Sequence, residues 1–305
     1  MKKKPIKDVA ASVHQRLLNK AHETGRSFNE LLQYFAMERF LYRLSKSPHA
    51  KKFVLKGALM FTVWKAPLSR PTMDIDLLGS TDKRIEAITS LTREICSEDV
   101  EPDGIVFDAD SIRGEHITED ADYEGVRLRF IGHLGNARIV MQLDIGFHDI
   151  VVPAAKLISY PIILDLPIPK LRGYSMESMI AEKFEAMVKL GKVNSRMKDF
   201  FDIWYLSRQF NFDGELLVTA VNKTFTNRGT KVPAQPIALT SDFAREPDRQ
   251  NQWSSFIRRT RLENIPGRLT DVVAEISSFL SPLCNALASG KSFRGIWKAP
   301  GPWSL

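Results

Sequence analysis

The sequence has 305 residues and two cysteines, and 44% of its residues are hydrophobic and 26% charged. This composition is typical of a soluble globular protein of one or two domains and excludes collagen-like, disordered and disulfide-stapled chains. Cys96 and Cys284 lack the close Cys or His neighbours of a thiolate metal site, and isolated cysteines fit the reducing cytoplasm. No apolar run is long enough for a signal peptide or a membrane span, so we expect a protein that is not secreted and engages no membrane.

The net charge of +7 is unevenly distributed along the chain. Residues 1–52 carry +8, residues 53–221 carry −7 and residues 222–305 carry +6, with Lys and Arg counted against Asp and Glu. An acidic centre suits bound cations, and basic flanks suit a polyanion such as a nucleic acid. The alternative is a scattered surface charge that serves only solubility.

Hydrophobic periodicity predicts helices at the N-terminus, a β region in the middle and helices again toward the C-terminus. Ser27 to Glu30 have the form of a capping box, which places the start of the second helix at Ser27. Gly135 and Asn136 separate two alternating segments, which indicates a β-hairpin. The predicted elements are two helices within 8–45, a short apolar stretch at 53–57, a helical turn at 58–64, a strand at 72–78, a helix at 82–97, a loop rich in Asp and Gly, hairpin strands at 126–130 and 139–145, a strand at 157–164, helices at 176–190, 195–209, 213–225, 249–263 and 269–288, and an extended C-terminal tail that docks.

An Asp-x-Asp motif occurs three times, as Asp74/Asp76, Asp108/Asp110 and Asp120/Asp122. Only the first pair lies in an apolar, strand-like run, where alternate side chains point to the same face. Two carboxylates on one strand face repel each other, so this pair predicts a divalent metal or a basic partner. The other two pairs lie in sequence typical of a polar loop. A solvated strand face is the alternative for the first pair.

Asp144 is a third carboxylate in a predicted strand, where it points opposite to Leu143 and Ile145. Three carboxylates on adjacent strands can hold two Mg²⁺ ions, which bridge nucleotide phosphates, lower the pKa of an attacking hydroxyl and offset charge on the leaving pyrophosphate. The alternative for Asp144 is a surface position on a one-sided sheet.

Lys183 lies in the middle of the apolar stripe of helix 176–190, which is formed by Met176, Met179, Ile180, Met187 and Leu190. We expect it to be buried or to face a cleft, where its ammonium needs a triphosphate or the aspartates as an anionic partner. The alternative is a stem that covers apolar surface while the ammonium reaches water. In the following helix, Asp199 and Asp202 lie one turn apart beside Arg196 and Lys198, a pattern that local ion pairs also explain.

Five segments in this order resemble the AbiEii/AbiGii-type nucleotidyltransferase toxins, over residues from about 50 to 210. They are Leu55-Lys-Gly57, Thr72-Met-Asp-Ile-Asp-Leu77, Gln142-Leu-Asp144, Ala181-Glu-Lys183 and Arg196-Met-Lys-Asp-Phe-Phe-Asp-Ile-Trp-Tyr-Leu206. In that family a Lys-Gly-Gly or Gly-Ser loop precedes the Asp-x-Asp strand, and a helical lysine and an Arg- and Asp-containing helix follow. This chain departs from the pattern at Ala58, where a second glycine or a serine is usual.

The resemblance implies a role for each matching residue. It assigns Mg²⁺ binding to Asp74 and Asp76, with Asp144 as the third carboxylate of the wider polymerase-beta-like superfamily. Lys183 and Asp202 complete the implied catalytic set, although Asp199 is an alternative for the further essential acid. The implied nucleotide contacts come from Lys56, Gly57, Lys183, Arg196, Lys198 and Asp199, with Gly57 approaching the triphosphate.

The implied fold class is α+β, with a polymerase-beta-like nucleotidyltransferase core of a mixed sheet and flanking helices, followed by a helical C-terminal domain. We place the nucleotidyltransferase domain and its helical N-terminal extension at residues 1–170. Residues 171–305 are expected to form a mostly helical domain that completes the active site and contacts the acceptor.

The resemblance also implies a bacterial type IV toxin–antitoxin or phage-defence system. The toxin would transfer NMP from an NTP to an RNA, with the tRNA 3′ end as the expected acceptor, and a separate antitoxin protein encoded nearby would be its partner. The basic termini agree with RNA: Arg258, Arg259 and Arg261 lie within one turn, beside Trp253 and Phe256, so phosphate contact and base stacking can share a helix. A solvated helix face is the alternative there.

Two other functions stay open from the sequence. One is nucleotidyl transfer to a small hydroxylated molecule or to a protein side chain, because the acceptor site leaves no sequence signature. The other is a non-catalytic protein that binds nucleotides or nucleic acids. The intact Asp74, Asp76 and Lys183 argue against the second of these.

Overall fold

The computed structural model describes residues 8–66, 70–117 and 125–304, which form two compact units. Unit 1 comprises the chain up to residue 65 together with residues 71–148 and 156–173. Unit 2 comprises residues 66–70, residues 149–155 and the chain from residue 174 onward. Unit 2 therefore includes two short segments that the predicted boundary at residue 170 places in the first domain.

Unit 1 begins with two helices, α1 (Val9–Thr24) and α2 (Phe28–Lys46). Asp8 caps α1, since its carboxylate accepts a hydrogen bond of 2.9 Å from the backbone N–H of Ala11. The second helix starts where the sequence predicts, but the predicted capping box is wrong. The Ser27 side chain makes no capping hydrogen bond, and Glu30 instead forms an i,i+4 ion pair of 2.8 Å with Arg26.

The core of unit 1 is a seven-stranded mixed sheet in the order β3-β4-β5-β2-β1-β7-β6. The pairs β2/β5 and β1/β7 are parallel, and the other neighbours are antiparallel. The strands are β1 (Phe53–Lys56), β2 (Asp74–Gly79), β3 (Ile105–His116), β4 (Gly125–Leu134), β5 (Ala137–Phe147), β6 (Lys156–Ser159) and β7 (Lys170–Gly173), and short helical elements lie at Ala50–Lys52 and at α3 (Leu59–Val63). The predicted hairpin is confirmed as β4 and β5.

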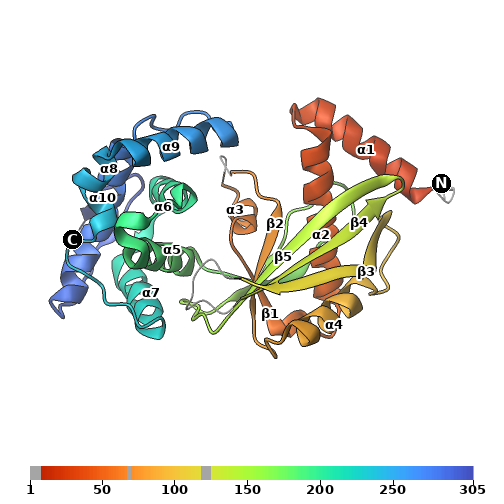
Figure 1. The fold of residues 1–305 in the computed structure, drawn as a ribbon, viewed down its shortest axis with the longest axis horizontal. Coiled ribbons are helices and arrows are strands. Elements are labelled where there is room, and N and C mark those ends of the chain that lie inside the picture. The colour runs from red at the N-terminus through yellow and green to blue at the C-terminus, as the bar shows by residue number, and fades with distance from the viewer. Residues whose placement is uncertain (1–7, 67–69, 118–124, 305) are drawn as a thin grey trace. The chain divides into compact units, whose positions relative to one another are not determined.

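Helices α2 and α4 (Ile85–Cys96) cover one face of this sheet (Figure 1). The strand residues on that face are apolar and buried. The Phe40 ring of α2 lies 5.8 Å from the ring of Phe107 on β3 and 5.4 Å from that of Phe130 on β4. Because side chains alternate along a strand, the residues between these buried ones point to the opposite face. We call that opposite face the polar face.

β3 lies in a stretch for which the sequence predicts a loop, and that prediction is wrong. Register shifts between Asp108 and Arg113 mark a bulge in this edge strand. Within the bulge the Asp108 carboxylate accepts hydrogen bonds from the backbone N–H groups of Asp110 and Ser111, at 3.0 and 3.2 Å. The interrupted alternation therefore hides the strand in the sequence.

Unit 2 is mainly helical, as predicted. Its helices are α5 (Met176–Leu190), α6 (Met197–Gln209), α7 (Gly214–Asn227), α8 (Ser241–Arg245), α9 (Pro247–Thr260) and α10 (Leu269–Ala288), with short 3₁₀ turns at Gly191–Val193 and Ile237–Leu239. The C-terminal tail docks through β9 (Ile296–Trp297) and β10 (Trp303–Ser304), which form a small sheet with β8 (Phe212–Asp213). The Trp303 ring stacks on Phe279 of α10 at 5.6 Å.

The predicted α+β class, with a mixed sheet, flanking helices and a helical C-terminal region, is confirmed. Within residues 8–66, 70–117 and 125–304, no helix has the length and apolar character needed to cross a membrane.

Candidate active site

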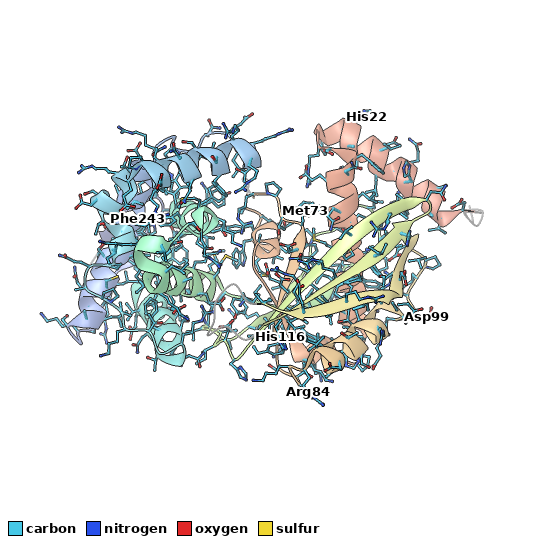
Figure 2. All side chains as sticks on the ribbon, in the orientation of Figure 1. His22, Met73, Arg84, Asp99, His116 and Phe243 are labelled. Carbon is cyan, nitrogen blue, oxygen red and sulfur yellow. The ribbon has the colours of Figure 1, made fainter. Side chains whose placement is uncertain are left out.

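The first Asp-x-Asp pair opens β2 on the polar face of the sheet. Asp74 and Asp76 are half-buried, whereas Ile75 and Leu77 between and after them are buried against the helices. Met73, labelled in Figure 2, directly precedes this pair and is 56% exposed. Both carboxylates therefore lie on the same face, as the alternation predicts.

A row of charged residues crosses the sheet at Asp76. Lys56 on β1 and Asp144 on β5 are its register partners on either side, and Arg127 on β4 is the register partner of Asp144. Directly opposed residues of neighbouring strands share a face, so all four belong to the polar face. The sheet therefore brings together three residues of the predicted site, Lys56, Asp76 and Asp144, from three different strands.

Asp144 has a partner that the sequence analysis did not assign. Arg127 holds its carboxylate in a bidentate pair, with Nε 2.8 Å from Oδ1 and Nη2 2.7 Å from Oδ2. The Asp144 side chain is 15% exposed and the Arg127 side chain is 19% exposed. The alternation of arginines with apolar residues in the hairpin was the available signal, because it places Arg127 on the same face as the acids.

Gly57 has a steric reason to be glycine. Its φ of 69° lies in the left-handed region, and a Cβ at this position would collide with the carboxylate of Asp76. The loop between β1 and α3 can therefore approach Asp76 closely only without a side chain at residue 57. Its predicted contact with a triphosphate remains a prediction.

The polar face suits a magnesium ion that shares its ligands with a substrate. Among the residues that the structure describes, no group of three or more His, Cys, Asp or Glu is arranged to hold a metal. Mg²⁺ usually binds through one or two carboxylates together with substrate phosphates and water, and not in an all-protein cage. Asp74 and Asp76, two carboxylates on one strand face, fit that mode of binding.

The other two Asp-x-Asp pairs do not join this site. The predicted loop position of Asp108 and Asp110 is wrong, because both lie on β3, where Asp108 caps the backbone of the bulge. Asp120 and Asp122 lie outside the described residues.

Unit 2 contains a second charged centre, which we call the Lys183 cluster: Arg70, Lys183, Arg196, Lys198, Asp199 and Asp202. The Lys183 Nζ lies 2.7 Å from Asp199 Oδ1 and 2.8 Å from Asp202 Oδ2. Asp199 and Asp202 are fully buried, and Lys183 is 14% exposed. Lys183 is thus largely buried, as its place on the apolar stripe predicts, and the two acids of α6 are its anionic partners.

Each acid of the cluster also binds an arginine. Arg196 Nε donates to Asp199 Oδ2 at 2.7 Å. Arg70 holds Asp202 in a bidentate pair, with Nε and Nη2 at 2.9 and 3.0 Å from the two oxygens. No sequence pattern pointed to Arg70, since it lies alone in a loop bracketed by prolines.

The charges of the cluster set its protonation states. Burial raises the pKa of Asp199, but the charges of Lys183 and Arg196 outweigh burial and hold that pKa well below its ordinary value. Burial likewise lowers the pKa of Lys183, but the charges of Asp199 and Asp202 outweigh it and raise that pKa. Desolvation, followed by the positive charge of Lys183, lowers the pKa of Lys198, although its side chain still reaches solvent.

The Lys183 cluster contains more basic than acidic side chains. Four basic side chains, Arg70, Lys183, Arg196 and Lys198, accompany two carboxylates. Burial lowers the pKa of Lys198 most, and the charges of Lys183, Arg196 and Arg70 lower it further. An anion such as a phosphate group would relieve this repulsion.

Comparison with known proteins identifies the family. The family model described as "Nucleotidyl transferase AbiEii toxin, Type IV TA system" matches residues 39–276, well over half of the chain. The match includes both charged centres described above. The chain belongs to the AbiEii nucleotidyltransferase toxin family. The predicted family resemblance is thereby confirmed.

Two crystal structures from Helicobacter pylori resemble this AbiEii chain. The "putative nucleotidyltransferase from H. pylori" has a TM-score of 0.48 and 16% identity, over 88% of this chain and 100% of that one. JHP933 has a TM-score of 0.48 and 15% identity, over 87% of this chain and 95% of that one. A search of curated proteins gives no match.

Membership of the AbiEii family makes the protein a nucleotidyltransferase, which confirms the predicted enzyme class. A nucleotide substrate follows from that activity. An antitoxin partner follows from the type IV toxin–antitoxin assignment of the family.

The predicted acceptor helix is only partly available for binding RNA. Arg258 and Arg259 on α9, and Arg261 directly after it, are exposed. Trp253 and Phe256 are buried, however, and stack on each other at 5.4 Å, with Phe256 5.7 Å from Phe201 of α6. The proposed base stacking on these two aromatic residues is therefore wrong, because they form the core contact of the helix.

Proposed function

We propose that this AbiEii-family enzyme transfers NMP from an NTP to an RNA, with the 3′ end of tRNA as the expected acceptor and Mg²⁺ as cofactor. Family membership supports the nucleotidyl transfer, and the paired carboxylates of β2 on the polar face support the dependence on a metal ion. Such a reaction belongs in the cytoplasm, as part of a toxin–antitoxin or phage-defence system.

Asp74 and Asp76 are the residues that would hold Mg²⁺. When bound, this ion would neutralise charge on the triphosphate and on the leaving pyrophosphate. Both side chains are half-buried, so they can exchange ligands while the buried Ile75 and Leu77 fix the strand. Gly57 leaves the space that the Asp76 carboxylate occupies. We propose Lys56, the register partner of Asp76, as a nucleotide contact on the same face.

The Lys183 cluster would contact phosphate oxygens. Repulsion among its basic side chains supports this role, because the charges of Lys183, Arg196 and Arg70 add to the effect of burial in lowering the pKa of Lys198. We assign Asp202 and Asp199 to holding these cations in place. Both acids are fully buried and already bind two basic groups each, so neither is suited to bind an ion directly.

RNA as acceptor is supported by the basic C-terminal region, residues 222–305, which carries +6. Arg258, Arg259 and Arg261 are exposed, and their side chains form no hydrogen bond or ion pair within the described part of the chain. Exposed arginines without local partners can bind phosphates and release counterions. We propose them as contacts to the acceptor backbone.

Incubation of the protein with each of the four labelled NTPs and total RNA tests the proposal. Label in RNA of tRNA size, lost on addition of EDTA and restored by Mg²⁺, is the expected result. The Asp74→Asn variant, which retains the shape of the side chain, is the matched control and should transfer no label. Label in protein or in a small molecule would replace RNA as the acceptor, and absence of label in every fraction would contradict catalysis.

A further inference from the structure

Asp144 and Arg127 form a preorganised pair directly beside the carboxylates of β2. Their four donor and acceptor atoms make two parallel contacts of 2.8 and 2.7 Å. Asp144 accepts a further hydrogen bond of 3.4 Å from the Gln142 side chain on the same strand. Both partners are largely buried, at 15% and 19% exposure, so solvent screens the pair only weakly.

This geometry does not suit a metal ligand at Asp144. Both of its carboxylate oxygens bind a guanidinium, and a cation placed on the same oxygens would be repelled by the arginine. The acids on this face are also not grouped as a three-carboxylate metal cage in the described residues. The Asp144 carboxylate therefore holds the Arg127 guanidinium in place and does not bind a metal.

The position of Arg127 on the polar face suits contact with an anion. It lies two strands from Asp76 in the same row, which corresponds to about 10 Å between backbones at the usual strand spacing. The bidentate pair with Asp144 holds the guanidinium of Arg127 in one plane. A carboxylate that fixes this plane reduces the entropy lost when the guanidinium binds a phosphate.

We propose that Asp144 is a positioning residue that presents Arg127 to the phosphates of the nucleotide. This inference rests on the proposed function, since it names a further substrate contact of the same site. The phosphates of the NTP are favoured over those of RNA, because Arg127 shares its row with Asp76, which would hold the ion that the triphosphate binds.

The test measures binding separately from catalysis. Affinities for inorganic pyrophosphate and for a non-hydrolysable NTP are measured by calorimetry, with and without Mg²⁺, in Arg127→Gln, Asp144→Asn and the double variant. Arg129→Gln is the matched control, since Arg129 lies two residues along the same strand on the same face and pairs with Glu115. Thermal melting checks the fold, and the double variant leaves no charge of the pair unpartnered.

Each single variant should weaken pyrophosphate and NTP binding by about 10- to 100-fold, as expected for a lost charge-assisted contact. The double variant should be no weaker than the singles, because the two residues act as one unit. The Mg²⁺ concentration for half-maximal NTP binding should stay unchanged in Asp144→Asn. Arg129→Gln should bind like the wild type.

A charge swap separates positioning from mere stability. The Arg127→Asp/Asp144→Arg variant restores an ion pair, but it moves the guanidinium to β5. Its melting temperature should recover toward that of the wild type while its pyrophosphate affinity stays low. Recovery of affinity would overturn the proposal, because the location of the guanidinium would then be irrelevant.

Two other outcomes would also refute the inference. Wild-type binding of pyrophosphate by Arg127→Gln would remove Arg127 from the phosphate site. A far higher Mg²⁺ requirement in Asp144→Asn would return Asp144 to the metal site. If the wild type itself binds neither pyrophosphate nor NTP, the proposed function fails together with the inference. If the wild type binds both and only the variants behave otherwise than expected, the inference alone fails.

Discussion

Lys183 offers a test of the unit 2 network that requires no activity. Lys183→Met keeps an unbranched side chain on the apolar stripe of α5 but removes the ammonium between Asp199 and Asp202. Two ammonium–carboxylate contacts of 2.7 and 2.8 Å are lost, and both acids remain fully buried. If the lysine only covered apolar surface, the same change would be neutral or stabilising.

The expected loss is about 3 kcal/mol. Hydrogen bonds to charged groups contribute about 1.5–3 kcal/mol each, and removing one partner from a buried ion pair costs about 3–5 kcal/mol. Asp199 keeps Arg196 and Asp202 keeps Arg70, so we take the low end of these ranges. For a domain of this size, that loss lowers the melting temperature by about 6–12 °C.

The assay is thermal melting of the wild type and Lys183→Met as a function of pH, with Lys223→Met as the matched control. Lys223 lies exposed on α7 of the same unit, so the control should change stability by less than about 0.5 kcal/mol. The native pKa of Asp199 is lowered, so its ionised form stabilises the wild type above the ordinary value near 3.8, and this contribution is lost as the pH falls below it. Because the variant lacks the share of that contribution that Lys183 supplies, the stability gap between the two proteins should narrow below about pH 4.

The raised pKa of Lys183 sets how the stability gap depends on pH at alkaline pH. Its stabilising charge is fully present below the ordinary value of 10.5 and is lost as the pH rises through the higher native value. The gap should therefore also narrow above about pH 10.5. A variant that melts within about 1 °C of the control at pH 7, or a gap that grows in acid, would refute this account of the cluster.

Three other sets of variants test the Asp-x-Asp pair, the Gly57 loop and the arginines of the proposed acceptor site. Asp74→Asn and Asp76→Asn should each reduce transfer of labelled NMP by at least about 100-fold and change the melting temperature by no more than about 2 °C, because a half-buried carboxylate leaves no cavity; transfer at the wild-type rate would remove the metal site from β2. Gly57→Ala and Gly229→Ala should each lose about 1 kcal/mol by melting, since both have positive φ (69° and 65°), but only Gly57→Ala should lose transfer, because nothing lies within 4 Å of a Cβ at residue 229. Arg258→Glu/Arg259→Glu/Arg261→Glu should weaken RNA binding and lower the slope of log K against log salt by roughly one unit per lost contact, without an effect on NTP affinity; an unchanged slope would make α9 a solvated face.

Sequence patterns within one helix or strand predicted which face a residue lies on. They did not predict side-chain pairs in which the partner comes from another helix, strand or loop. The stripe of α5 placed Lys183 in a buried position. Arg70, which binds the same Asp202 as Lys183, comes from a distant loop with no periodicity. Strand alternation placed Asp144 on the face of Asp76, but its pairing with Arg127 depends on the register of β4 against β5. The bulge at Asp108 broke the alternation that would have revealed β3.

The predicted base stacking on α9 was wrong for a related reason. Periodicity shows that Trp253 and Phe256 share one face of α9, but it does not show which face packs on the protein. Large apolar side chains gain most by burial, and here they stack on each other and on Phe201. Arg258 and Arg259 lie on the exposed side of α9. The structure therefore supports the predicted phosphate contacts of the arginines, but not the predicted base stacking.

The burial of the acids assigns them different tasks in the proposed reaction. A carboxylate that accepts a proton from an attacking hydroxyl must be able to meet that hydroxyl. Asp202 is fully buried, with both oxygens bound to Arg70 and one also to Lys183, so an incoming hydroxyl has no access to it. Asp74 and Asp76 are half-buried on the polar face. Loss of Asp202 would therefore reach the chemistry through the displaced cations Lys183 and Arg70, whereas loss of Asp74 or Asp76 would act on it directly.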